Sequence, residues 1–270
     1  MTVKNWQLTP PFLLLVLCVL YLFIFNNGGH YIEQYVNIQK ELFFYLNSEL
    51  SKFPDLQYNL TQLGDVLIFF SFISIFILYA PRLWEALLNS AILSLIVSAT
   101  LKELLDIPRP AALFDHNTFV IIGRTHHGLA SLPSGHSIAT FVVITILLYA
   151  FMPKKNINKI LWCTSILTLG VIIAFSRVAV GAHYPFDTII GSIIGYIVTI
   201  IGIRISTKLE WLNYVRKKKY LPVLILLIVI WVCIIIHKII ESNLLVFYLS
   251  LLSLGITLFL ISKLYVQTKN

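Results

Sequence analysis

The stretch "SLPSGHSIATFVVITILLYAF", residues Ser131 to Phe151, joins a polar Pro-Ser-Gly-His sequence to a run of apolar residues. The apolar run from Ser137 to Phe151 approaches the length of an α-helix that crosses a bilayer. His136 stands directly before this run, where an ionisable group costs free energy and usually marks a functional position. The stretch therefore predicts a membrane helix that begins at a functional residue.

The composition of the whole chain predicts a polytopic membrane protein. Hydrophobic residues make up 58% of the chain and charged residues 12%, with a mean hydropathy of +0.87, whereas an average soluble domain is about a quarter charged. We expect an all-α helical bundle with about eight transmembrane helices. The apolar segments run from Pro11 to Phe25, Val66 to Ala80, Leu83 to Leu101, Ser137 to Phe151, Ile160 to Phe175, Thr188 to Ile205, Leu221 to Ile236 and Leu244 to Leu264.

The distribution of Lys and Arg predicts the orientation of this bundle. Most of the 20 Lys and Arg residues fall on the side that holds both chain ends, and cytoplasmic loops are enriched in these residues. Both termini are therefore expected in the cytoplasm, with His136 facing outwards. Because orientation accounts for the net charge of +8, we do not expect nucleic acid as a partner. The compact loops and the many Ile, Lys and Asn residues favour a bacterial inner membrane.

The outer segment from His30 to Phe53 has apolar residues mostly three or four positions apart, which predicts an amphipathic helix. We expect it to lie along the outer membrane surface with its charged residues towards water. Two roles are consistent with this pattern: a helix that only covers the bundle, and one that helps to admit substrate.

Three motifs fall on the outer side of the predicted bundle. They are "KELLDIPRP" from Lys102 to Pro110, Pro-Ser-Gly-His from Pro133 to His136, and "SRVAVGAHYPFD" from Ser176 to Asp187. Taken singly, each residue fits a plain structural role, because basic residues at helix ends extend towards the interface and Ser-Gly pairs turn the chain. Together they place cations, imidazoles, a carboxylate and a helix start at one depth: Lys102, Arg109, Arg177, His136, His183, Asp187, Ser134 and Gly135.

This combination indicates phosphoryl transfer, which depends on positioning and on electrostatic stabilisation of the phosphate oxygens. The three basic residues can supply the cations, while Ser134 and Gly135 lie where a helix presents unpaired N–H groups. Asp187 follows His183 by four positions, so the carboxylate can orient the imidazole. We therefore predict that His183 is the nucleophile and His136 the general acid.

The patterns K-x6-R-P, P-S-G-H and S-R-x5-H-x3-D resemble the signature of the type 2 phosphatidic acid phosphatase superfamily, in its membrane-bound lipid phosphatase branch. The resemblance implies a metal-independent phosphatase that needs no cofactor and forms a phosphohistidine on His183. In it Asp187 would orient His183, His136 would be the acid, and the residues Lys102, Arg109, Ser134, Gly135 and Arg177 would bind phosphate.

The resemblance also implies a domain organisation. Membrane members have a six-helix core, which predicts a catalytic core over residues 60–205. Residues 1–59 would form the first span and the outer amphipathic helix, and residues 206–270 a basic cytoplasmic loop with two additional C-terminal spans.

The sequence leaves the substrate open. A phosphate site at the outer interface favours a lipid phosphate or lipid pyrophosphate, such as undecaprenyl pyrophosphate. A lipid A phosphatase and a lipid-to-lipid phosphotransferase are alternatives with the same mechanism. A transporter of anions or lipids is the alternative from another class, although the predicted span interiors carry almost no charge. Arg124, His126 and His127, before the Pro-Ser-Gly-His motif, fit either solvated loop polarity or recognition of a second phosphate.

Overall fold

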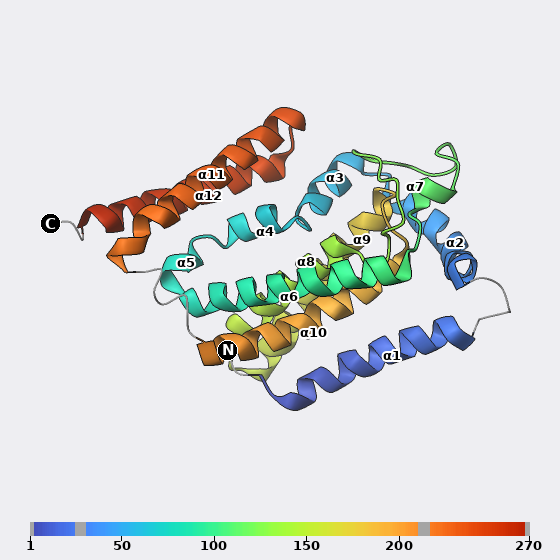
Figure 1. Ribbon diagram of the computed structural model, residues 1–270, viewed down its shortest axis with the longest axis horizontal. Coiled ribbons are helices and arrows are strands. Elements are labelled where there is room, and N and C mark those ends of the chain that lie inside the picture. The colour runs from blue at the N-terminus through green and yellow to red at the C-terminus, as the bar shows by residue number, and fades with distance from the viewer. Residues whose placement is uncertain (1–2, 25–30, 210–216, 268–270) are drawn as a thin grey trace.

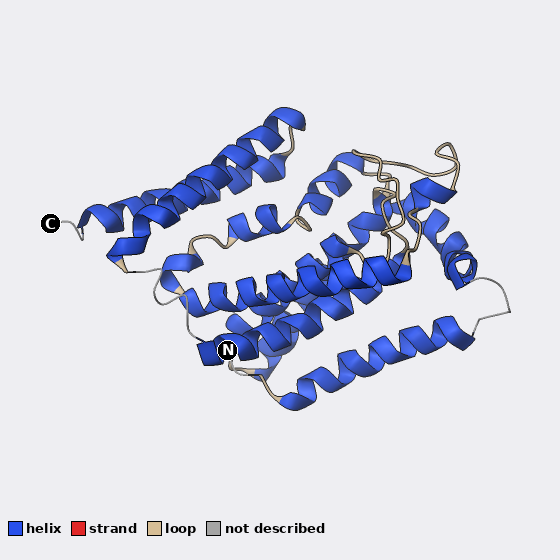
Figure 2. Cartoon of the chain, viewed as in Figure 1, coloured by secondary structure: helices blue, strands red, loops and turns tan. Residues whose placement is uncertain are grey.

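The computed structural model describes residues 3–24, 31–209 and 217–267, and the regular elements within these ranges are all helices (Figures 1 and 2). The predicted all-α membrane bundle is confirmed. The basic loop at residues 210–216 and the end of the first apolar segment at Phe25 lie outside the described residues. The short elements are η1 (Asn5–Leu8), α3 (Pro54–Gln62), α7 (Pro110–Leu113) and η3 (Lys218–Tyr220).

The centre of the bundle is formed by α6 (Pro81–Leu105), α8 (Gly135–Ala150), α9 (Asn156–Ala179) and α10 (Pro185–Leu209). Glycines on α10 allow its neighbours to approach closely, as small residues do in membrane bundles. A Cβ on Gly195 would lie 2.5 Å from the Ile138 carbonyl oxygen of α8, and one on Gly202 would lie 2.8 Å from the Ser90 backbone nitrogen of α6. The first contact brings α8, whose N-terminus carries His136, close against α10, and the second does the same for α6.

The predicted number of spans is only partly reproduced. Within the described residues five segments are long and apolar enough to cross a membrane, and the apolar helices Trp6–Tyr21 and Gly135–Ala150 are shorter. The expected span from Val66 to Ala80 is not one helix, because it divides into α4 (Val66–Phe72) and α5 (Phe76–Tyr79).

The break between α4 and α5 is compensated by side chains from other helices. The indole nitrogen of Trp84 on α6 donates to the Ile73 carbonyl at 3.0 Å, and Ser253 Oγ donates to the Ser71 carbonyl at 2.7 Å. The same carbonyls also accept from the Phe76 and Ser74 amides at 3.0 and 3.2 Å, so local turns and distant side chains together keep the interrupted span hydrogen-bonded.

The C-terminal helices α11 (Leu221–Glu241) and α12 (Leu245–Gln267) form a hairpin that packs mainly against α4 (Figure 1). Its contact with the core includes polar groups: Ser74 Oγ lies 2.7 Å from Thr257 Oγ1, and Trp231 Nε1 donates to the Leu67 carbonyl at 3.1 Å. The hairpin is therefore tied to the interrupted span by hydrogen bonds as well as by apolar packing.

The amphipathic helix predicted before the second span is confirmed as α2 (Tyr31–Leu50). Its buried face is not purely apolar, because Tyr35, Gln39 and Asn47 are buried beside Val36 and Phe43. Asn47 bonds to backbone groups of the loop after α7 and of the end of α9. α2 therefore packs across the end of the bundle where the three motifs meet (Figure 1).

Candidate active site

The three sequence motifs come together at one end of the bundle, opposite the end where α1 (Thr9–Ile24) begins and α12 finishes (Figure 1). α6 supplies Lys102 near its C-terminus, and Arg109 immediately precedes α7. α8 begins at Gly135, and His183 lies in the tight turn between α9 and α10.

His183 and Asp187 form a buried hydrogen-bonded pair. Nδ1 of His183 lies 3.2 Å from Oδ2 of Asp187, and the side chains are 2% and 0% exposed. The carboxylate accepts further bonds from Tyr35 Oη at 2.6 Å, Ser131 Oγ at 2.6 Å and the Tyr184 amide at 2.9 Å. Charge-assisted hydrogen bonds of this kind fix the carboxylate in one orientation and offset part of the cost of burying its charge.

The second nitrogen of His183 faces a guanidinium group. Nη1 of Arg109 lies 3.4 Å from Nε2 of His183, and Arg109 also donates to the Ala182 and Ala130 carbonyls at 3.4 and 3.3 Å. Because arginine only donates hydrogen bonds, Nε2 is the acceptor and the ring proton sits on Nδ1, towards Asp187. The lone pair that could attack phosphorus therefore points towards a cation that could bind the phosphate oxygens.

Arg177 carries an unsatisfied donor at the same site. Its side chain is buried, with 4% of the residue exposed, and Nη1 donates to Thr61 Oγ1 at 2.7 Å. Nε of Arg177 is fully buried and has no hydrogen-bond partner among the described residues. Buried donors are rarely left unpaired, so this geometry is suited to an anionic ligand.

The N-terminus of α8 presents further donors. Ser134 is the N-cap: its Oγ accepts from the amide and hydroxyl of Ser137 at 3.3 and 3.0 Å, and its own amide donates to the Asp187 carbonyl at 3.0 Å. The amides of Gly135 and His136 are therefore the ones that this cap leaves for a ligand. A Cβ on Gly135 would lie 3.6 Å from Lys102 Nζ, so the ammonium group borders this helix start.

His136 is held against the loop between α3 and α4. A Cβ on Gly64 would lie 2.7 Å from the His136 Cβ and 2.9 Å from its Cδ2, so only glycine fits beside this imidazole. His136 is partly buried and close enough to His183 to interact with it electrostatically. All eight predicted site residues thus gather at one end of the bundle, with Ser134 completely buried as a helix cap.

Residues 82–211 match the family model described as the PAP2 superfamily. The segment that carries the candidate site therefore belongs to the PAP2 superfamily. A curated relative, the undecaprenyl-diphosphatase of Sulfolobus acidocaldarius, is 24% identical over 199 residues, which is 72% of this chain and 90% of the relative. The chain is accordingly an enzyme, a membrane phosphatase of the PAP2 type.

Two crystal structures share the fold. LpxE of Aquifex aeolicus aligns with a TM-score of 0.51 and 23% identity over 62% of this chain and 95% of that one. The PAP2-type phosphatidylglycerolphosphate phosphatase of Bacillus subtilis aligns with a TM-score of 0.53 and 16% identity, over 76% of this chain and 98% of that one.

The loop before the Pro-Ser-Gly-His motif brings one further residue near the cationic cluster of Lys102, Arg109 and Arg177. Burial, followed by the charges of Arg177 and Arg109, lowers the pKa of the half-buried His126 to about 4. His127 is exposed and packs against the His116 ring at 5.3 Å between centroids. Of the loop residues left open by the sequence, His126 is therefore the one that borders the site.

Burial is also the largest effect on His183. It lowers the pKa of this imidazole well below its ordinary value, and Arg109 and then Arg177 lower it further. The neutral form of His183, which carries the nucleophilic lone pair, is therefore favoured before substrate binds.

Tyr35 and Ser131, which donate to Asp187, were not identified as site residues from the sequence. A signal was present, because Tyr35, Gln39 and Asn47 recur at spacings of four and eight along the buried face of α2. Burial, followed by the Asp187 charge, raises the pKa of Tyr35 well above its ordinary value, so its hydroxyl stays protonated and donates. Gln39 supports this helix by accepting a hydrogen bond from the Phe186 amide at 3.0 Å.

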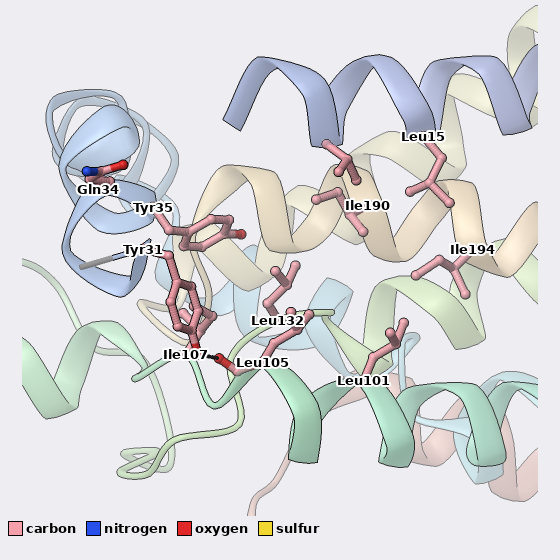
Figure 3. Close-up of a pocket in the computed structure, with 11 residues that line it drawn as sticks. Leu15, Tyr31, Gln34, Tyr35, Leu101, Leu105, Ile107, Leu132, Ile190 and Ile194 are labelled. Atoms are coloured by element: carbon pink, nitrogen blue, oxygen red, sulfur yellow. Dashed lines mark hydrogen bonds between the residues drawn. The ribbon is translucent and has the colours of Figure 1, made fainter. Parts of the chain in front are cut away.

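An apolar cavity of about 380 Å³ adjoins the PAP2 site between α1, α2, α6 and α10 (Figure 3). Tyr35 lies in its wall, as do Leu101, next to Lys102, and Leu132, next to Ser131. The remaining lining is almost entirely aliphatic or aromatic, and comprises Leu15, Val19, Tyr31, Gln34, Leu105, Ile107, Ile190 and Ile194.

Proposed function

We propose that this protein removes phosphate from a lipid phosphate or lipid pyrophosphate, with the hydrocarbon chain in the apolar cavity and the phosphate on the cationic cluster. The observation that carries the proposal is the position of Tyr35, which lines the cavity and donates to the carboxylate partner of His183. An apolar chain and an anionic headgroup on one molecule match these two adjacent environments.

In the proposed complex Lys102, Arg109 and Arg177 bind the phosphate oxygens together with the amides of Gly135 and His136. The orphaned Nε of Arg177 would gain its missing acceptor. Ser134 would contribute by fixing the start of α8 through its capping bonds.

The proposed reaction proceeds in two steps. Nε2 of His183 attacks the terminal phosphorus while the bond to its leaving oxygen breaks, and His136 gives that oxygen a proton. The leaving oxygen belongs to the lipid alcohol in a lipid phosphate and to the lipid monophosphate in a lipid pyrophosphate. Asp187 accepts the Nδ1 hydrogen bond and stabilises the positive charge that develops on the phosphorylated imidazole. Water then attacks the phosphohistidine, His136 takes a proton from the water, and inorganic phosphate leaves.

A polyprenyl pyrophosphate such as undecaprenyl pyrophosphate is the preferred substrate, because the chain is similar over most of its length to an undecaprenyl-diphosphatase. His126, inside the cationic field, is suitably placed to meet a second phosphate. Transfer of phosphate to a second lipid and hydrolysis of a lipid A phosphate use the same groups and remain the alternatives.

We also propose the bacterial cytoplasmic membrane as the location, with both termini inside and the site outside. The bundle has the site at one end and the first and last described helices beginning and finishing at the other, which supports placing the site and the chain ends on opposite sides of the membrane (Figure 1). The distribution of Lys and Arg supports the cytoplasm as the side of the chain ends. A Cys introduced at the exposed Asn117, on the same side as the site, should react with an impermeant thiol reagent in intact cells. Labelling only after lysis would invert the orientation.

The proposed domain organisation is a catalytic core at residues 60–205, preceded by residues 1–59 and followed by residues 206–270. The family match at residues 82–211 supports the position of the core.

The test is phosphate release by detergent-purified protein from undecaprenyl pyrophosphate, phosphatidate, phosphatidylglycerol phosphate and lipid A. The comparison includes His183→Ala and, as a matched control, His127→Ala on the exposed loop. We expect release by the wild type and the control variant, and none by His183→Ala. Release by His183→Ala would refute the nucleophile, and activity only with paired lipids would favour phosphotransfer. Inactivity in every combination, with specific binding of a lipid or anion, would favour transport.

A further inference from the structure

Residues 59–65, the bridging segment, lie between the candidate active site and the C-terminal hairpin α11–α12. This segment includes the end of α3 and the turn that leads to α4. Its residues contact candidate site residues on one side and the hairpin on the other.

Towards the candidate active site, the bridging segment contacts two site residues, Arg177 and His136. Thr61, which is 2% exposed, accepts the hydrogen bond from Nη1 of Arg177 at 2.7 Å. Gly64 packs so closely on His136 that any Cβ would overlap the imidazole. The position of this turn therefore limits where the His136 ring can lie.

Towards the hairpin, two polar contacts hold the same segment. Oδ1 of Asn59 accepts from the Val246 amide at 3.0 Å, in the first turn of α12. Oδ2 of Asp65 accepts from Lys238 Nζ at 3.0 Å, near the end of α11, with the side chains only 25% and 26% exposed. The other oxygen of Asp65 caps α4 by accepting from the Leu67 amide at 2.9 Å.

We propose that the hairpin α11–α12 is a positioning element of the active site, which holds His136 through the Lys238–Asp65 ion pair and Gly64. This inference rests on the role of His136 as general acid given above. Lys238 does not contact the reacting atoms, so we expect it to affect the rate only through the position of the His136 imidazole. A donor displaced by about 1 Å can cost about 100-fold in rate.

The readout is the dependence of rate on the leaving group. Phosphatidate releases an alkoxide, which needs a proton from His136, whereas p-nitrophenyl phosphate releases a stable phenolate that needs little help. Misplacing His136 should therefore slow the first substrate much more than the second. A general loss of folded protein would reduce both rates by the same factor.

The experiment compares kcat/KM on both substrates for Lys238→Met, Lys238→Arg and His136→Ala. Lys263→Met serves as the matched control, because Lys263 is an exposed residue near the opposite end of the hairpin. We expect His136→Ala to lose about 100-fold or more on phosphatidate and much less on p-nitrophenyl phosphate. Lys238→Met should show the same selectivity with a loss of about 10-fold, Lys238→Arg should restore most of the rate, and Lys263→Met should resemble the wild type.

The outcomes separate the two proposals. If His136→Ala slows both substrates equally, the role of His136 as acid is wrong. If His136→Ala is selective and Lys238→Met is not, the positioning role of the hairpin is overturned, even where the melting temperature falls. Should Lys238→Met fail to fold, Asn59→Ala breaks the other contact with the hairpin, and equal losses on both substrates would overturn the inference in the same way.

Discussion

Replacing Tyr35 with Phe tests whether α2 takes part in the reaction. The change removes one hydroxyl and with it the 2.6 Å hydrogen bond to Oδ1 of Asp187, while the ring stays in the wall of the cavity. Hydrogen bonds to charged groups contribute about 1.5–3 kcal/mol, which corresponds to about 10- to 150-fold in rate if the whole bond acts in the transition state. Asp187 keeps its bonds from Ser131, Tyr184 and His183, so we expect the lower end, a loss of about tenfold in kcat.

The assay is phosphate release from a lipid phosphate in detergent micelles, measured across pH. With one donor fewer, the Asp187 carboxylate is stabilised less, so activity should begin to fall at a higher pH than in the wild type. Tyr31→Phe is the matched control, because Tyr31 is also on α2 and lines the same cavity, but its hydroxyl donates to the Leu105 carbonyl at 2.9 Å. A Tyr35→Phe enzyme with the kcat and pH profile of Tyr31→Phe would refute the reasoning.

Three further predictions concern the cations, pH and metal. Arg177→Lys should reduce kcat/KM about 10- to 100-fold in the same assay, because Lys cannot pair with two phosphate oxygens while bonding Thr61; an unchanged value would contradict this role. Because the folded-state pKa of His183 lies below the ordinary 6.5, the unfolded chain takes up a proton at a higher pH than the folded one. The melting temperature should therefore fall as pH decreases below 6.5, and fall less in His183→Asn; equal slopes would exclude this linkage. Finally, phosphate release should persist in EDTA, and a loss that Mg²⁺ restores would indicate metal-assisted chemistry.

The residues of the candidate site could be predicted because their spacing along the chain reflects local geometry. His183 and Asp187 are separated by four positions across a helix start, so the contact between them needs little knowledge of the rest of the fold. Lys102, Arg109 and Arg177 could be assigned to the same side of the membrane because each stands at the same end of an apolar segment. Because successive spans cross the membrane in opposite directions, motifs that are distant in the sequence were expected at the same membrane surface.

The interruption of the second span could not be predicted in the same way. Val66 to Ala80 is apolar throughout much of its length, which favours one continuous helix. The hydrogen bonds that compensate for the break come from Trp84 and from Ser253, which lies 182 positions beyond its partner Ser71. Ser253 is a partner only because α12 of the hairpin packs against α4, and no local pattern indicates that contact.

The sequence by itself determined that the chain is a helical membrane protein and which residues form the candidate site, because hydropathy and short spacings act locally. Only the tertiary structure decided what surrounds that site. Tyr35 bonds to Asp187, which is 152 positions away in the sequence, and Lys238 bonds to Asp65, which is 173 positions away. Contacts of this kind depend on how whole helices pack, and local sequence patterns do not encode which distant surfaces will meet.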